Sequence, residues 1–117
     1  MKIFEVVQLL EADVRSSSDE LQRFVIGGYA SDLLSDVMAH AVEGCLWVTL
    51  VAHQNVTAVA ALVGIPAIVI VGGAEPDEAT LAKAGQEKIV VMTTHLSAYE
   101  VCGRLYQAGL PAEVKRV

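Results

Sequence analysis

The segment CLWVTLVAHQNVTAVAALVGIPAIVIVGG, residues Cys45–Gly73, decides the fold of this chain. It opens and closes with continuous, largely β-branched runs, at 46–51 and 67–71, of the kind found in strands covered by helices on both faces. Between them Asn55 is placed to cap a helix that ends at Gly64, and the apolar residues at helical spacing are Val56, Val59, Ala60 and Val63. Strand, helix and strand follow one another in the fewest residues that a parallel crossover allows. The segment therefore predicts two strands in the middle of a parallel sheet.

The residues before this segment predict a helix, a sheet edge and a further strand. Residues 2–11 carry their apolar side chains on one helical face. The serine-rich stretch that follows favours a turn, and we expect a hairpin-like edge with an extended piece near 13–17. A strand near 25–30 is then followed by a helix whose cap is one of two polar residues, Ser31 or Asp32.

The residues after the segment continue the alternation of strand and helix. Pro76 is expected at the first position of a helix whose first turn is acidic. Residues 89–93 repeat the buried-strand pattern, and a capping box that starts at Ser97 opens the last helix. The alternation predicts one domain over residues 1–117, an α/β three-layer sandwich with a mostly parallel sheet of four to five strands.

The composition narrows the class of protein. The chain has 117 residues, a net charge of −6, 54% hydrophobic residues and only 19% charged residues. This apolar surplus predicts a homodimer, joined through the hairpin-like edge and the first helix. The acidic balance, with no cluster of Lys or Arg, argues against nucleic acid and membranes as partners. Cys45 and Cys102 lie far apart without metal-ligand spacing, which predicts reduced thiols, a cytoplasmic location and no metal site.

No complete catalytic or cofactor motif occurs in the chain. It has no P-loop for a nucleoside triphosphate, no GxGxxG for a dinucleotide and no GxSxG around a nucleophilic serine. The two cysteines lie in apolar surroundings, which raise the pKa of a thiol and make it a poor nucleophile. We therefore expect that the chain is not an enzyme and that it carries no cofactor.

The polar residues of this apolar chain gather where the predicted parallel strands end, the first of them ending in a glycine pair. Such strand ends meet at one edge of a sheet, where helix N-termini present their amides to a ligand. The candidate ligand contacts are Gly27, Gly28, Ser31, His53, Asn55, Gly72, Gly73, Thr94 and Ser97. We expect a small anionic ligand at this edge, a nucleotide or a similar compound with a base or acyl part to bury. The alternative is that these residues only turn the chain and cap its helices.

Several blocks in the chain resemble the DRTGG-domain family. They are QRFVIGGYASDLLSDVMAHA, CLWVTLVAHQNVTAVAAL, VIVGGAEPDE and TTHLSAYEVCGRLY, and the resemblance runs from about Met1 to Tyr106, nearly the whole chain. The family is named for an Asp-Arg-Thr-Gly-Gly motif, of which Arg23, Gly27 and Gly28 match. Gln22 and Ile26 stand where the acidic residue and the threonine are expected.

The resemblance implies a Rossmann-like three-layer fold, often dimeric, in a module that accompanies an active site. Similar domains occur at the N-terminus of HPr kinase and between the CBS domains of regulated inorganic pyrophosphatases, and free-standing ones are encoded near iron-only hydrogenase components. It therefore implies a non-enzymatic regulatory or assembly module that binds a ligand, a partner enzyme or both, of the hydrogenase-associated type. The alternative from another class is a small enzyme acting on a phosphorylated or acyl substrate, with His53 as the acid-base group and glycine amides as the anion cradle.

Overall fold

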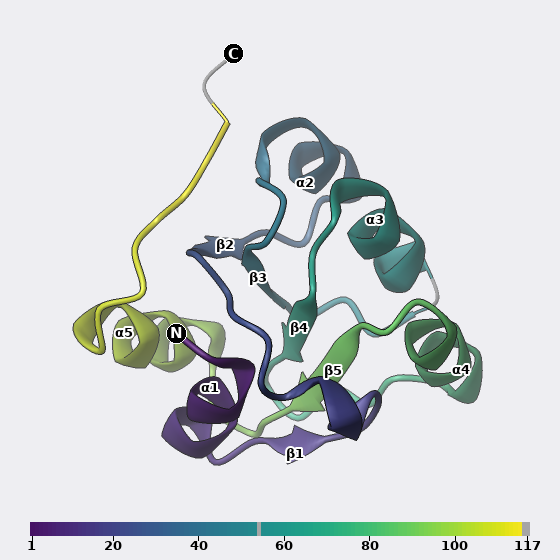
Figure 1. Ribbon diagram of the computed structural model, residues 1–117, viewed down its shortest axis with the longest axis horizontal. Helices are drawn as coiled ribbons and strands as arrows, with labels where there is room; N and C mark the ends of the chain where they lie inside the picture. The colour runs from purple at the N-terminus through teal and green to yellow at the C-terminus, as the bar shows by residue number, and fades with distance from the viewer. Residues whose placement is uncertain (54, 116–117) are drawn as a thin grey trace.

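A five-stranded sheet forms the centre of the molecule in the computed structural model, which describes residues 1–53 and 55–115 (Figure 1). The strands are β1 Asp13–Val14, β2 Gly28–Ala30, β3 Leu46–Thr49, β4 Ala67–Ile70 and β5 Val90–Thr93. They lie side by side in the order β1-β5-β4-β3-β2. Every residue of β3, β4 and β5 is buried, as their unbroken apolar runs predicted.

The direction of the strands makes the sheet mixed, which corrects the expectation of a mostly parallel one. β2, β3, β4 and β5 run parallel to their neighbours, whereas β1 runs antiparallel to β5. β1 enters the sheet at the carboxyl end of β5, where Asp13 pairs with Thr93, and so runs in the opposite direction. The parallel strands also follow one another in chain order without a reversal, so the structure does not show the doubly wound order of a Rossmann fold.

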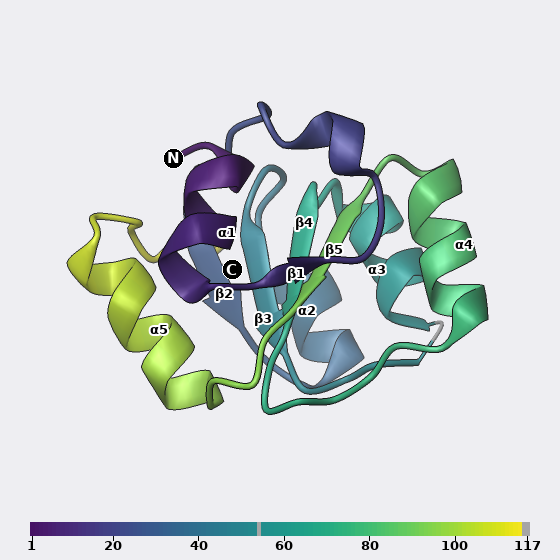
Figure 2. The same ribbon diagram turned by 90° about the horizontal axis from the view of Figure 1, so that it is seen from below.

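Helices cover both faces of the sheet. They are α1 Ile3–Leu10, the short 3₁₀ helix η1 Ser18–Glu20, α2 Leu34–His40, α3 Asn55–Val63, α4 Glu78–Gln86 and α5 Ala98–Gln107. α2, α3 and α4 connect successive parallel strands and lie together on one face, because right-handed crossovers in one direction place their connections on the same side. α1 and α5 cover the other face (Figure 2).

The hydrophobic core forms two layers, one on each face of the sheet. Leu46 and Val69 pack in the layer beneath α1 and α5, whereas Trp47 and Ile68 pack in the layer beneath α2, α3 and α4. The two layers thus take alternate residues of the same strands. Trp47 is fully buried, and its indole N–H donates to the carbonyl of Ser31 at 2.8 Å, so the largest core side chain also fixes the chain that leaves β2.

The stretch between α1 and β2 is not the hairpin-like edge that its sequence suggested. β1 does lie at the edge of the sheet, but it pairs only with β5, and the serine-rich stretch continues into η1. The hydroxyl of Ser16 donates to the carbonyl of Ile89 at 2.8 Å and accepts from the amide of Val91 at 2.9 Å. The side chain of Ser16 therefore forms hydrogen bonds with the edge of β5 that the backbone of a second hairpin strand would otherwise form.

Two helices begin later than expected. Leu33, not Ser31 or Asp32, occupies the N-cap position of α2, and the Ser31 hydroxyl instead accepts the Leu33 amide at 3.2 Å. In α4 the N-cap is Asp77, so Pro76 precedes the helix and does not open it. Asp77 accepts the amide of Thr80 at 2.8 Å, which satisfies one of the free donors of the first turn.

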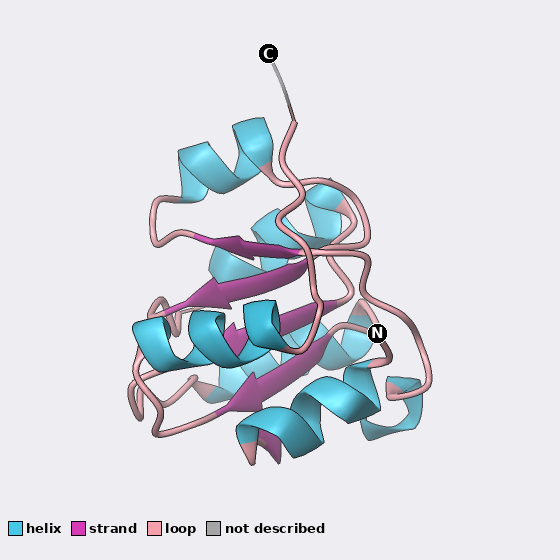
Figure 3. Cartoon of the chain, turned by 90° about the vertical axis from the view of Figure 1, so that its left-hand side faces the viewer, coloured by secondary structure: helices cyan, strands magenta, loops and turns pink. Residues whose placement is uncertain are grey.

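The C-terminal tail after α5 runs beside β2 (Figure 3). The amide of Gly28 donates to the carbonyl of Pro111 at 2.8 Å, and Gly28 forms a parallel bridge with Ala112. The tail then turns towards the end of α2, where Val114 pairs with Ala41. Within residues 1–53 and 55–115, none of the helices has the length and apolar character needed to span a bilayer.

Candidate functional site

The glycine pair predicted at the carboxyl edge of the sheet lies at the opposite edge. Gly28 is the first residue of β2 and pairs with Leu46, the first residue of β3, so both glycines belong to the amino ends of the strands. A Cβ atom on Gly27 would lie 2.4 Å from Cγ of Glu113 in the tail. Gly27 is therefore needed for the close approach of the tail, and the expectation that the pair forms part of the ligand edge is wrong.

Gly72 and Gly73 do lie at the carboxyl edge, but their amides are already bonded. The N–H of Gly72 donates to the carbonyl of Leu96 at 2.8 Å, and that of Gly73 donates to the carbonyl of Thr94 at 3.0 Å. Both glycines have positive φ angles, +69° and +75°, which side chains disfavour. The pair thus ties the turn after β4 to the turn after β5, and the amide cradle for an anion that we expected does not exist here.

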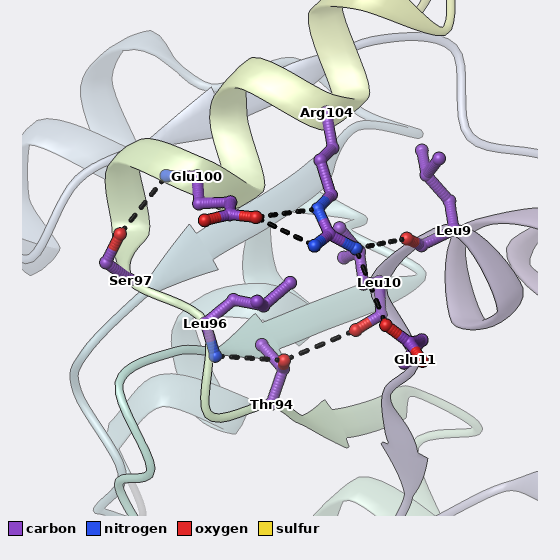
Figure 4. A network of polar contacts seen from close by, with 8 residues as sticks. All are labelled: Leu9, Leu10, Glu11, Thr94, Leu96, Ser97, Glu100 and Arg104. Atoms are coloured by element: carbon purple, nitrogen blue, oxygen red, sulfur yellow. Dashed lines mark hydrogen bonds and ion pairs between the residues drawn. The ribbon is translucent and has the colours of Figure 1, made fainter.

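The hydroxyls of Thr94 and Ser97 are likewise committed within the protein (Figure 4). Thr94 is buried; its hydroxyl donates to the carbonyl of Leu10 at 3.3 Å and accepts the amide of Leu96 at 3.2 Å. Ser97 caps α5 by accepting the amide of Glu100 at 3.2 Å. The carboxylate of Glu100 does not close a capping box and bonds to Arg104 instead. These hydrogen bonds give Thr94 a structural role in the turn after β5 and Ser97 one at the start of α5.

Arg104 completes this network and joins α5 to α1 (Figure 4). Its guanidinium donates to Glu100 at 2.7 Å and to the carbonyl of Leu9 in the last turn of α1 at 3.1 Å. A cation at the C-terminus of a helix binds carbonyls that have no partner within the helix and complements the helix dipole. Arg104 is thus a structural link between the two helices that cover this face of the sheet.

Asp32 lies at the carboxyl edge, and its position before α2 suggested only a helix cap. Its carboxylate accepts the hydroxyl of Thr49 and the amide of Leu50, both at 2.8 Å. It therefore holds the turn after β2 against the end of β3. Ser31 beside it is used by its own turn, as described above, so both side chains have partners within the protein.

His53 lies on the loop between β3 and α3, and Asn55 lies at the start of α3. Both are exposed. Asn55 is the first residue of α3, not the residue before it, and the cap position falls on residue 54, outside the described residues. Hydrogen bonds from Thr80 lower the pKa of the Asp77 carboxyl, and the nearby His53 adds to this effect. His53 therefore lies close to the N-terminus of α4.

A charged recess remains at the carboxyl edge, between β1 and the turns after β4 and β5. It is lined by Asp13, Arg15, Gly73, Ala74, Glu75, Thr93, Thr94 and His95. Arg15 and Glu75 form an ion pair across it, with one guanidinium-to-carboxylate distance of 2.7 Å. This contact holds the pKa of the Glu75 carboxyl below its usual value, and His95 contributes to the same shift. Of the expected site residues, Gly73 and Thr94 meet here.

The other reactive side chains of residues 1–53 and 55–115 lie apart from one another. Burial raises the pKa of the Cys45 thiol to about 11 and also raises that of Cys102, which agrees with the poor nucleophiles that we expected. His40 lies 3.0 Å from Asp36 at the end of α2. Among the residues that the structure describes, no group of three or more His, Cys, Asp or Glu side chains is placed to hold a metal ion.

Comparison with known proteins gives a family and a structural relative. The model of the DRTGG domain matches residues 5–108. A solved structure with the same fold contains the CBS and DRTGG domains of the regulatory region of Clostridium perfringens pyrophosphatase, complexed with the activator diadenosine tetraphosphate. The two chains share 14% sequence identity with a TM-score of 0.71, over 94% of this chain and 47% of the other. No curated protein matches the chain.

The structural match shows the fold alone, whereas the match to the family model shows the family. At 14% identity the likeness to the pyrophosphatase region shows the fold, and this chain spans about half the length of that region. The family model, in contrast, covers most of the sequence, including most of α1, the whole sheet and α5. The chain belongs to the DRTGG-domain family.

Proposed function

We propose that this chain is a regulatory module that binds a small nucleotide-like ligand and acts on a partner enzyme without catalysing a reaction itself. Its family membership supports a regulatory role. The relative of the same fold is part of the regulatory region of a pyrophosphatase and was crystallised with a dinucleotide activator. The partner that the sequence resemblance suggests for this chain is an iron-only hydrogenase component.

The observation that carries the ligand proposal is the charged recess at the carboxyl edge. Arg15 presents a planar guanidinium there, and this group binds phosphate through two parallel hydrogen bonds. Its present partner, Glu75, is a solvent-exposed carboxylate, and exposed ion pairs contribute little to stability. A phosphate that replaces Glu75 on Arg15 breaks only this weak contact, with His95 beside it, and it must also offset the carboxylates of Asp13 and Glu75 that line the recess.

The alternative of a small enzyme has less support. It required glycine amides as an anion cradle, but the N–H groups of Gly72 and Gly73 bond to the turn after β5. It also required His53 to face a substrate, and His53 is exposed on the loop beside Asp77. The thiols of the two cysteines are held in their protonated form by burial. No second function is proposed.

Loss of the ligand from an Arg15→Ala variant tests the proposal. In a thermal-shift screen of adenine and guanine nucleotides, acyl phosphates and coenzyme A, at least one compound should stabilise the wild type. At one hundred times its dissociation constant the gain is about 2.7 kcal/mol. The gain should vanish in Arg15→Ala and persist in Arg23→Ala, which removes another exposed arginine at the opposite edge. Gly73→Val is unsuitable, because the φ angle of +75° strains any side chain.

Two results would contradict this role for the recess. In the first, no compound stabilises the wild type at millimolar concentration, and the carboxyl edge is then only a set of turns and caps. In the second, a ligand binds equally well to Arg15→Ala, which places its anionic group elsewhere.

We also propose that the module is a homodimer located in the cytoplasm. The apolar composition supports self-association, and the short β1 edge with α1 is the proposed contact, where Phe4 is 42% exposed. Light scattering at micromolar concentration should give close to twice the 12.4 kDa mass of one chain. A single peak at the mass of one chain would remove the dimer and leave the ligand proposal intact.

A further inference from the structure

An apolar groove lies on the face of the sheet covered by α1 and α5, between β2, α5 and the C-terminal tail. Its lining is Gly28, Tyr29, Ala30, Val48, Cys102, Leu105, Tyr106, Leu110, Pro111 and Ala112. Its volume is about 140 Å³, compared with about 90 Å³ for the charged recess. The apolar groove is therefore the larger of these two hollows. It adjoins β2, the outermost strand on one side of the sheet, whereas the recess adjoins β1 on the other side.

The groove exists because β2 has only small residues on this face. Gly28 and Ala30 pair with Leu46 and Val48, which fill the corresponding space over β3. Nothing in the protein requires glycine at position 28. Its φ angle is not positive, and a Cβ atom there would meet Leu110 at 3.5 Å, an ordinary contact. The hollow thus follows from the choice of residues on β2 and not from a steric limit of the fold.

The outer edge of β2 leaves one residue without backbone partners. The amide of Leu46 donates to Gly27 and the amide of Ser31 donates to Val48, so odd-numbered residues of β2 face β3. Gly28 and Ala30 face outwards. The tail bonds to Gly28 and then leaves the edge. In the part of the chain that the structure describes, the N–H and C=O of Ala30 have no hydrogen-bond partner, and Ala30 lines the groove.

We propose that this groove binds the base of a purine nucleoside. The flat ring of a purine can lie between the small residues of β2 and the wall formed by Leu105 and Tyr106. The side chain of Tyr106 supplies an aromatic ring for the base to pack against. The edge of a purine carries both donors and acceptors, which can bond to the open backbone groups of Ala30. An acyl chain would displace the water that bonds to these backbone groups and would offer no hydrogen bond in return. Leaving the N–H and C=O of Ala30 unbonded in this way costs free energy. The chemistry of the groove therefore favours a base.

This site is separate from the charged recess and goes beyond the proposed function. The recess adjoins β1 and the groove adjoins β2, which are the two edges of the sheet. These two outermost strands lie four strand spacings apart, roughly 19 Å. One mononucleotide does not reach both, so the groove should bind an uncharged nucleoside on its own.

Titration of the ¹⁵N-labelled protein with adenosine tests this proposal. The amide signal of Ala30 should shift, and Ala30→Leu, which fills the groove from an exposed position, should weaken binding by about tenfold or more. Ala61→Leu makes the same change at an exposed position on α3 and should bind adenosine as the wild type does. Gly28→Ala, whose methyl group has room, is the second groove variant if Ala30→Leu does not fold.

The outcomes separate this site from the proposed function. The groove is excluded as a nucleoside site if adenosine leaves the Ala30 amide unmoved, or if it binds Ala30→Leu as tightly as the wild type. If adenosine fails in this way while a nucleotide still stabilises the protein through Arg15, only the groove is lost. If adenosine binds in the groove and no compound depends on Arg15, the groove stands and the charged recess is lost.

Discussion

Replacing Trp47 with alanine is expected to lower the free energy of unfolding by about 4 kcal/mol, within the range for removing a large buried aromatic side chain. Trp47 has no exposed surface and packs with Ile68 in the layer beneath α2, α3 and α4. The change also leaves the carbonyl of Ser31 without the indole N–H. The loss is a large share of the roughly 5–15 kcal/mol by which small domains are stable.

Urea unfolding followed by circular dichroism measures this loss, because Trp47 is the one tryptophan in the chain and its fluorescence disappears with it. Trp47→Phe keeps most of the volume and should cost less. Leu62→Ala, at a position that is 74% exposed on α3, should change stability by less than about 0.5 kcal/mol. A loss for Trp47→Ala no larger than that of Leu62→Ala would mean that β3 does not lie at the centre of the core.

Replacing Thr94 with valine should cost about 2 kcal/mol, because it leaves the carbonyl of Leu10 and the amide of Leu96 without their partner in a buried place. The methyl group that takes the place of the hydroxyl cannot bond to either. One bond joins the turn after β5 to the end of α1, and the other holds that turn in shape before α5, so the contact of α1 with the sheet is weakened.

Thr94→Ser is the matched control, since it keeps the hydroxyl and removes only a methyl group. It should lose about 1 kcal/mol or less. If Thr94→Val were as stable as the wild type and only bound ligand more weakly, Thr94 would be a ligand contact, as its position after a strand first suggested. Chemical denaturation of the two variants without ligand distinguishes these roles.

The central crossover could be predicted because its signals are local. The covered strands are unbroken apolar runs, so β3 and β4 lie within the expected 46–51 and 67–71. The helix between them has its own spacing and stop, and it begins one residue before the expected 56–63. β2 has no such run. With three residues and a glycine at its start, it could not be told from sequence whether the glycine pair begins or ends the strand. That ambiguity moved Gly27 and Gly28 to the wrong edge.

The candidate site could be predicted only in part, because its groups find partners far away in the sequence. Gly73 and Thr94 do reach one recess. The residue types suggested free amides and hydroxyls, but Thr94 bonds to Leu10 across 84 residues. Arg15 meets Glu75 across 60 residues, and nothing near Arg15 in the sequence indicates a partner. Asp32 resembled a cap for the same reason, since its bonds to β3 form only in the folded sheet.

A time course of one-dimensional proton NMR spectra on the protein with a mixture of nucleotides, acyl phosphates and coenzyme A tests the central claim most directly, since it reports binding and turnover in the same sample. A regulatory module predicts saturation transfer from the protein to at least one nucleotide, whose concentration stays constant throughout. Signals of a new product would contradict the claim and show an enzyme. Absence of transfer to any compound would equally contradict it, because the charged recess would then bind none of the ligands for which its chemistry is suited.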